Sequence, residues 1–317
     1  MKQEVKNQHY VPQFYLRKFG TGKKSGRSVY VFNKKILKIS MQRIKDIANK
    51  EYFYDLDIEN MGKLCSEENK QILEEVFGQI EIATSPILDS IINKIENAYK
   101  SNMKILTNEN EITLEEREVF SKFLATQYTR TNSFRECIAS IYEMPLEKVK
   151  EMSKEKEIET QISEKDKRRL HINFLLRNFI EKIPVNYFSK RRWIFNYNTT
   201  DKKLCTSDNP INIVQMRNFG PYGVGLATAD FLVFPLTPKI SLYMVHPSLS
   251  PELNTSSIEE SYLSEIKSSQ DIEELNLNQR YHCYNEIYSL DNDFERIKAA
   301  CKNNENNIIK SPNERIG

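Results

Sequence analysis

The residues best suited to chemistry gather close to the start of the chain. His9 and Tyr10 precede a Val-Pro step, and Gln13 and Arg17 follow it four residues apart. A residue before proline favours an extended backbone, and proline is well tolerated in the first turn of a helix. We therefore expect an extended segment up to Val11 and then a short helix on which Gln13 and Arg17 share one face.

This arrangement supports two interpretations. In the functional one, His9 is a general acid or base or a metal ligand, Arg17 clamps an anion, and Tyr10 and Gln13 contact the same ligand. In the structural one, His9 is hydrogen-bonded within the core and Arg17 pairs with a carboxylate on a neighbouring helix. The residues alone leave both open.

Two further polar groups lie much later in the chain. Asp208 and Asn209 follow a predicted strand, where Asp208 can act as a base and Asn209 as a donor to an oxyanion. The alternative is an Asx turn, which the sequence Ser-Asp-Asn-Pro forms readily. Gln127 and Arg130 are three residues apart on a predicted helix, and Arg130 is either a ligand for a phosphate or carboxylate or one half of a buried ion pair.

The elements that must position these side chains begin with a hairpin and helices. Residues 28–40 predict a β-hairpin with its turn at 33–35, and residues 52–54 predict another short strand. Isoleucine, valine and alanine residues spaced by three and four predict an amphipathic helix over 66–98 that Pro86 kinks or restarts. Thr113-x-x-Glu116 is a capping box for the next helix, and residues 170–182 predict an apolar helix.

From residue 191 the pattern changes to β. Residues 193–195 and 203–206 predict two strands paired around a turn, and further strands are expected at 211–214, 231–235 and 241–245. A helix over 258–285 is expected to close the chain. The glycine-rich loop 218–225 is expected to be mobile.

The resulting class is α+β, with an N-terminal β-hairpin, a helical middle and an antiparallel β-rich C-terminal part closed by a helix. We expect one domain over residues 1–300. Its parts are a basic N-terminal motif and hairpin (1–58), a helical region (59–190) and a β-rich region (191–300), followed by a polar tail (301–317).

Composition removes several classes of protein. The five cysteines are scattered without a C-x-x-C pair, there are four histidines, and the nine glycines form neither a dinucleotide-binding nor a Walker motif. We therefore expect no metal site and a location in the reducing cytoplasm, with no membrane contact because no apolar run is long enough to span a bilayer. The sequence leaves the cofactor unknown.

Charge is unevenly distributed. Residues 1–50 hold 13 Lys and Arg against two acidic residues, whereas the whole chain has a net charge of only +2. A basic segment on an acidic body can attract phosphate, nucleic acid or an acidic partner, or it can dock against the acidic helices of its own chain.

Four stretches carry a resemblance to a known family. Residues 7–19 (NQHYVPQFYLRKF) resemble the opening signature of the family called domain of unknown function 4238. Residues 123–131 are similar to its Gln-x-x-Arg-Thr segment, residues 206–210 to its Thr-Ser-Asp-Asn-Pro turn, and residues 275–289 to its closing helix. Asn132 departs from the pattern, which has proline there. The resemblance covers about residues 7–290 and implies a prokaryotic domain, also met in phages, with no established reaction.

Our first functional hypothesis is that these stretches converge on one polar pocket for a phosphorylated ligand, either a nucleotide or a nucleic-acid end, which the protein either only binds or also hydrolyses. The pocket would hold the residues named above together with Asn276. The alternative is a non-catalytic protein-binding module in phage–host conflict that binds a host or phage defence complex, as an inhibitor of an anti-phage defence system or as a component of it, and that can form oligomers. A third hypothesis is non-specific binding of nucleic acid by the basic segment.

Overall fold

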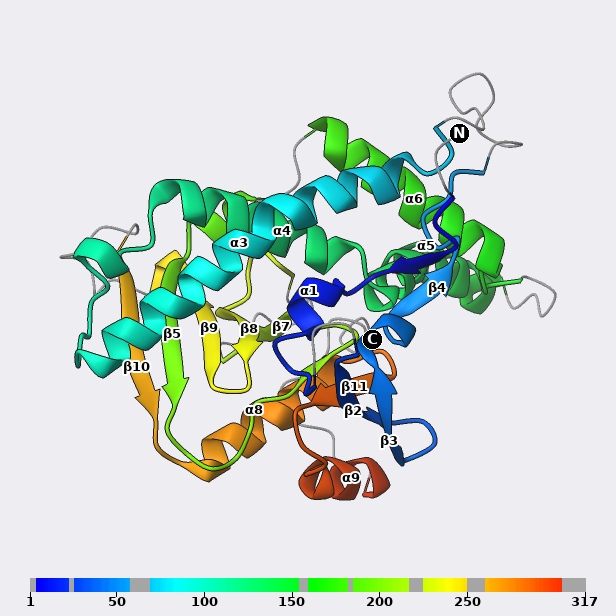
Figure 1. Cartoon of the computed structure of the whole chain (residues 1–317). Coiled ribbons are helices and arrows are strands. Elements are labelled where there is room, and N and C mark those ends of the chain that lie inside the picture. The colour runs from blue at the N-terminus through cyan, green and yellow to red at the C-terminus, as the bar shows by residue number, and fades with distance from the viewer. Residues whose placement is uncertain are drawn as a thin grey trace.

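Long helices form the middle of the chain. The computed structural model describes residues 4–22, 26–57, 69–153, 159–181, 185–216, 225–249 and 260–303. Within these, the helical middle consists of α3 (Ile72–Lys100), α4 (Leu114–Thr129), α5 (Asn132–Ser153), α6 (Glu164–Glu181) and the short α7 (Asn186–Ser189) (Figure 1). None of the described helices combines the length and apolarity needed to cross a membrane.

The predicted helices are confirmed, with one refinement at Pro86. This proline lies inside α3, which continues on both sides of it as one helix of 29 residues. The capping box at the start of α4 is present: the Glu116 N–H donates to Thr113 Oγ1, and the Thr113 N–H donates to a Glu116 carboxylate oxygen. α5 begins at Asn132, so the proline expected from the family pattern would fall in a first turn, where proline is tolerated.

The N-terminal part consists of short elements. These are β1 (Asn7–His9), α1 (Gln13–Leu16), β2 (Ser28–Asn33), β3 (Lys38–Arg43) and β4 (Asn49–Glu51). The predicted hairpin is confirmed as β2 and β3, but its second strand starts two residues late because Leu37 in the turn has a positive φ of 53°. The strand predicted at 52–54 is wrong: Tyr52 has a φ of 49° and turns the chain after β4.

The remaining strands are β5 (Arg192–Asn198), β6 (Thr206–Ser207), β7 (Asn212–Val214), β8 (Phe231–Thr237), β9 (Ile240–Val245), β10 (Ser261–Ile266) and β11 (Glu286–Ser289). Five of these strands form one sheet in the order β10-β5-β9-β8-β7. The other two join the N-terminal hairpin in a four-stranded sheet, in the order β3-β2-β11-β6. β10 pairs with β5 in parallel, so the larger sheet is mixed rather than wholly antiparallel. β1 pairs separately with β4.

Three sequence predictions in this region are corrected. The segment 203–206 does not pair with β5, because β6 joins β11 of the smaller sheet instead. The helix predicted over 258–285 contains a strand at 261–266 before α8 (Ser269–His282). The stretch 275–289, which resembles the family's closing helix, is helical only as far as His282 and then contains β11. In both places a strand partner far away in sequence decides the conformation. After β11 the described chain ends with α9 (Glu295–Lys302).

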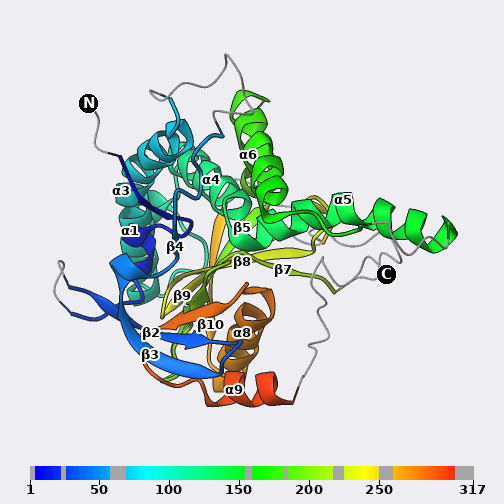
Figure 2. The same ribbon diagram turned by 90° about the vertical axis from the view of Figure 1, so that its right-hand side faces the viewer.

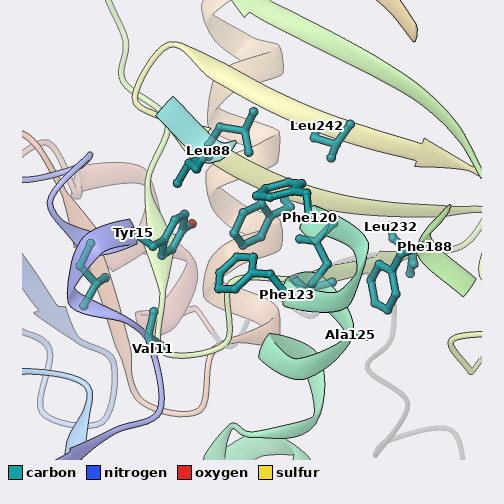
Figure 3. Close-up of a cluster of buried hydrophobic side chains, with 14 of the residues drawn as sticks. Val11, Tyr15, Leu88, Phe120, Phe123, Ala125, Phe188, Leu232 and Leu242 are labelled. Atoms are coloured by element: carbon teal, nitrogen blue, oxygen red, sulfur yellow. The ribbon is translucent and has the colours of Figure 1, made fainter. Parts of the chain in front are cut away.

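The largest buried core joins the helices to both sheets, and two smaller clusters of buried side chains include residues of α8. α3 and α4 pack along one side of the five-stranded sheet, while α8 lies on the side of the smaller sheet (Figures 1 and 2). Figure 3 shows Phe120 and Phe123 of α4 reaching toward Tyr15 of α1. The Tyr15 ring stacks on Phe234 of β8 at 4.8 Å between centroids, and its hydroxyl donates to the Pro235 carbonyl. The N-terminal motif is therefore anchored in the centre of the molecule.

Candidate functional site

The first two sequence motifs meet at a single carbonyl group. Tyr10 follows β1, and its backbone oxygen accepts hydrogen bonds from Gln127 Nε2 at 3.0 Å and Arg130 Nε at 3.2 Å. The three-residue spacing on α4 also lets Arg130 Nε donate to Gln127 Oε1 at 3.2 Å. The predicted convergence of these two motifs is present, but these polar atoms bind the protein's own backbone.

Arg130, itself buried, forms an ion pair with a partly exposed glutamate. Its Nη1 lies 2.9 Å from a carboxylate oxygen of Glu81 on α3, its guanidinium lies 5.2 Å from the centroid of the Phe77 ring, and the side chain is 1% exposed. Its carbonyl accepts the hydroxyl of Tyr54. Of the two alternatives for Arg130, these contacts are those of an ion-pair partner within the helical core.

His9 and Arg17 lie beside this junction. Burial and the positive charge of Arg130 lower the pKa of His9 to about 4, so its imidazole is neutral at pH 7. Its Nε2 is buried without a hydrogen-bond partner among the described residues. Arg17 reaches Gln13 Oε1 at 3.4 Å, as their four-residue spacing predicts, and no hydrogen bond joins His9 or Arg17 to Asp208.

Asp208 holds the turn that leads from α8 into β11. Its carboxylate oxygens accept the backbone N–H groups of Tyr284 at 2.7 Å, Asn285 at 2.7 Å and Glu286 at 2.9 Å. Burial raises the pKa of Asp208 to about 6, while the three N–H donors act in the opposite direction. Instead of forming a local Asx turn, Asp208 satisfies the backbone of a segment more than seventy residues away.

The two predicted asparagines also join α8 to the segment before β7. Asn209 Nδ2 donates to the His282 carbonyl at 2.9 Å, and Asn209 Oδ1 lies 3.5 Å from the Thr131 hydroxyl. Asn276 accepts the Cys205 N–H and donates to the Lys203 carbonyl, both at 2.9 Å, and thus pairs with an extended segment as a strand would. The catalytic and binding roles predicted from the sequence stay predictions, and each of these side chains also has a structural task.

A cavity of about 310 Å³ opens where the second and third motifs meet. Its walls come from the end of α4, the first turns of α5, the segment around β7 and the end of α8. Two of the predicted motifs contribute to it, because Thr131 follows Arg130 and Asn209 follows Asp208. The lining residues are Lys34, Tyr128, Thr131, Ser133, Phe134, Glu136, Cys137, Asn209, Ile211, Ile213, Tyr281, His282, Cys283 and Tyr284. We call it the Tyr284 pocket.

Three lysines gather around Tyr284 at this pocket. The ammonium groups of Lys35 and Lys50 lie 4.9 Å and 5.8 Å from the centroid of its ring, and Lys34 donates to the Cys283 carbonyl. Within the described part of the chain, none of the three forms an ion pair with a carboxylate. They belong to the basic N-terminal segment, so part of its excess charge is concentrated beside an aromatic cavity.

His282 is the pocket residue with the clearest unused polar atom. Its side chain is 8% exposed, and its Nε2 has no hydrogen-bond partner among the described residues. Burial lowers the pKa of His282 to about 4, so the ring is neutral at pH 7. Lys34, His282 and Tyr284 were not predicted as site residues. The adjacent lysines of the hairpin turn were the one signal in the sequence, and we interpreted them only as a turn.

Metal binding has no support in the described residues, which contain no group of three histidine, cysteine or acidic side chains placed to hold an ion. The cysteines 137, 205, 283 and 301 are all free thiols. What the geometry defines is an α+β protein with a lysine-rimmed aromatic pocket built from sequence-distant motifs.

The chain belongs to the family described as "Protein of unknown function (DUF4238)", which matches residues 7–293. No curated protein and no solved structure matches the chain. The resemblance seen in the sequence is thereby confirmed, and the family itself assigns no reaction.

Proposed function

We propose that this protein binds a small phosphorylated ligand with a planar ring, such as a nucleotide, in the Tyr284 pocket. The observation that carries this proposal is the group of three lysines without carboxylate partners beside an aromatic cavity. Lysine ammonium groups attract phosphate, and aromatic side chains stack on planar rings. A cavity of about 310 Å³ suits a ligand of mononucleotide size.

Polar groups on the walls support the same ligand class. Ser133 lines the pocket and is partly exposed, so its hydroxyl can bind the edge of a ring or a sugar. The contacts favour binding over hydrolysis, because Asp208, the predicted base, already accepts three backbone N–H groups. The free thiols suit the reducing cytoplasm in which we propose that the protein acts.

Thermal unfolding with a panel of mononucleotides, inorganic phosphate and short oligonucleotides tests this function. We expect at least one mononucleotide to raise the Tm, and the double variant Lys35→Glu/Lys50→Glu to lose that increase. Lys35 is exposed, whereas the Lys50 ammonium group donates to Asn132 Oδ1 at 2.7 Å, so the unliganded Tm of the double variant is measured alongside.

The matched control is Lys38→Glu/Lys45→Glu, which makes the same change of charge at exposed lysines of the same segment that, among the described contacts, do not lie over the Tyr284 ring. This control should keep the ligand-induced increase in Tm. The proposal fails if no phosphorylated compound raises the Tm of the wild type, or if both double variants lose the response equally. A response to oligonucleotides alone would favour nucleic-acid binding instead.

A further inference from the structure

The C-terminal half of α5 exposes a strip of large apolar side chains. At the spacing of an α-helix these side chains fall within about 140° of its circumference, so they form one continuous face. Between 38% and 85% of each is exposed, an uncommon property for neighbouring apolar residues on one helix. The residues of this α5 strip are Ile141, Tyr142, Leu146, Val149 and Met152.

The strip lies on a part of α5 that extends away from the body of the molecule. Figure 2 shows α5 running outward beyond the helices and sheets that surround its first turns. Its buried side chains, Asn132, Arg135, Ile138 and Ala139, all belong to the first eight residues of the helix. Packing against the rest of the described chain therefore does not explain why the outer half is apolar.

Two pairs of residues on this side of α5 are symmetrically placed about one point of the helix. Ile141 and Met152 lie at equal distances on either side of the midpoint between residues 146 and 147, and so do Glu143 and Lys150. Glu143 and Lys150 fall on the same edge of the strip at helical spacing. In an antiparallel pair of identical helices centred on that midpoint, Glu143 of each copy lies level with Lys150 of the other.

We propose that the α5 strip binds the same strip of a second copy of this chain in an antiparallel, two-fold symmetric contact. The charges point to a second copy, because an edge suited to an acidic or a basic partner would carry one sign, whereas this edge carries both signs at self-complementary positions. The strip spans about 16 Å of helix, so we expect a weak dimer with a Kd of roughly 10–100 µM.

Sedimentation equilibrium over a concentration range of ~1 to ~500 µM tests the contact. We expect the wild type to move from the mass of one chain, 37.3 kDa, toward twice that mass. Val149→Asp should remain a monomer throughout with an unchanged Tm, because its side chain is 53% exposed. Ile82→Asp is the matched control: Ile82 is 69% exposed on α3, and its substitution should leave association unchanged.

A charge exchange distinguishes a symmetric contact from general stickiness. Glu143→Lys and Lys150→Glu should each weaken self-association, because each places like charges opposite one another, and an equal mixture of the two variants should associate again. Because the Ile162 N–H also donates to Glu143, the Tm of Glu143→Lys is measured alongside.

Three results would overturn the proposal: a wild type that stays monomeric at the highest concentration, an Ile82→Asp control that dissociates as readily as Val149→Asp, or folded charge variants whose mixture fails to associate. The dimer should form without added ligand, so the test of the dimer is independent of the test of nucleotide binding.

Discussion

Arg130 illustrates how a side chain suited to anion binding can instead hold two parts of the chain together. Its Nε contacts the Tyr10 carbonyl, and its Nη1 contacts Glu81, so the N-terminal motif, α3 and α4 meet at one guanidinium group. The three polar motifs of the sequence share this property. Asp208 and Asn276 likewise bind backbone groups of remote segments, and Asp208 is buried as Arg130 is.

We predict that Arg130→Lys lowers the free energy of unfolding by about 2–4 kcal/mol. Lysine keeps the positive charge, but one ammonium group cannot replace the planar guanidinium that bonds to Tyr10 and Glu81 together. Urea unfolding measures the change. Arg17→Lys is the control, expected to stay within about 1 kcal/mol because Arg17 is partly exposed. Equal effects of the two substitutions would contradict the structural role of Arg130.

At the scale of elements, α3 is the longest helix described and crosses the molecule with a proline in its interior. Proline lacks the N–H that a helix interior uses and crowds the preceding turn. Pro86 is exposed, whereas its neighbours Thr84 and Leu88 are buried. Pro86 therefore weakens the backbone hydrogen bonding of α3 but leaves intact the face of the helix that packs against the core.

We predict that Pro86→Ala raises the free energy of unfolding by roughly 1–2 kcal/mol. Alanine restores a backbone donor and has the highest helix propensity, although part of this gain is offset because proline also restricts the unfolded chain. Thermal unfolding followed by circular dichroism at 222 nm measures the change. A fall in Tm would mean that a bend at Pro86 is needed for α3 to pack on α4 and the sheet.

At the scale of the whole molecule, buried titratable groups connect the fold to pH. Burial raises the pKa of Glu74 on α3 from 4.5 to about 7, with Glu81 and Asp55 adding to the effect and Arg130 opposing it. A carboxyl whose pKa is higher in the folded state than in the unfolded state favours folding when protonated. Glu74 therefore costs stability above pH 7, and this cost disappears as the pH falls toward 4.5.

We predict that Glu74→Gln stabilises the protein by about 2–3 kcal/mol at pH 8 and by nearly nothing at pH 4.5, because glutamine resembles the protonated acid in size and charge. Urea unfolding at a series of pH values measures this difference. Glu118→Gln, an exposed position on α4, is the control and should give no pH-dependent difference. If Glu74→Gln raises the free energy of unfolding by the same amount at every pH in this range, titration of Glu74 is excluded as the cause.

The sequence by itself determined much of the local structure and little of the site. Periodicity and the capping box predicted α3 and α4, and the hairpin at β2 and β3 followed from its alternation, because these patterns depend on neighbouring residues. The sequence also predicted that the motif at Tyr10 and the pair Gln127 and Arg130 lie close together, and the structure places them in contact. The family could be assigned from the sequence alone.

Only the tertiary structure decided which residues surround a cavity and which hold the chain together. β10 was predicted as helix because its partner β5 lies far away in sequence, and the stretch 275–289 that resembles the family's closing helix includes β11, whose partner β2 is equally remote. For the same reason Lys34, His282 and Tyr284 could not be assigned to one pocket: they come from a hairpin turn and from the end of α8, almost 250 residues later. A linear pattern reports residue types and spacing, whereas burial, ion pairing and an unused imidazole nitrogen depend on what the rest of the chain brings alongside.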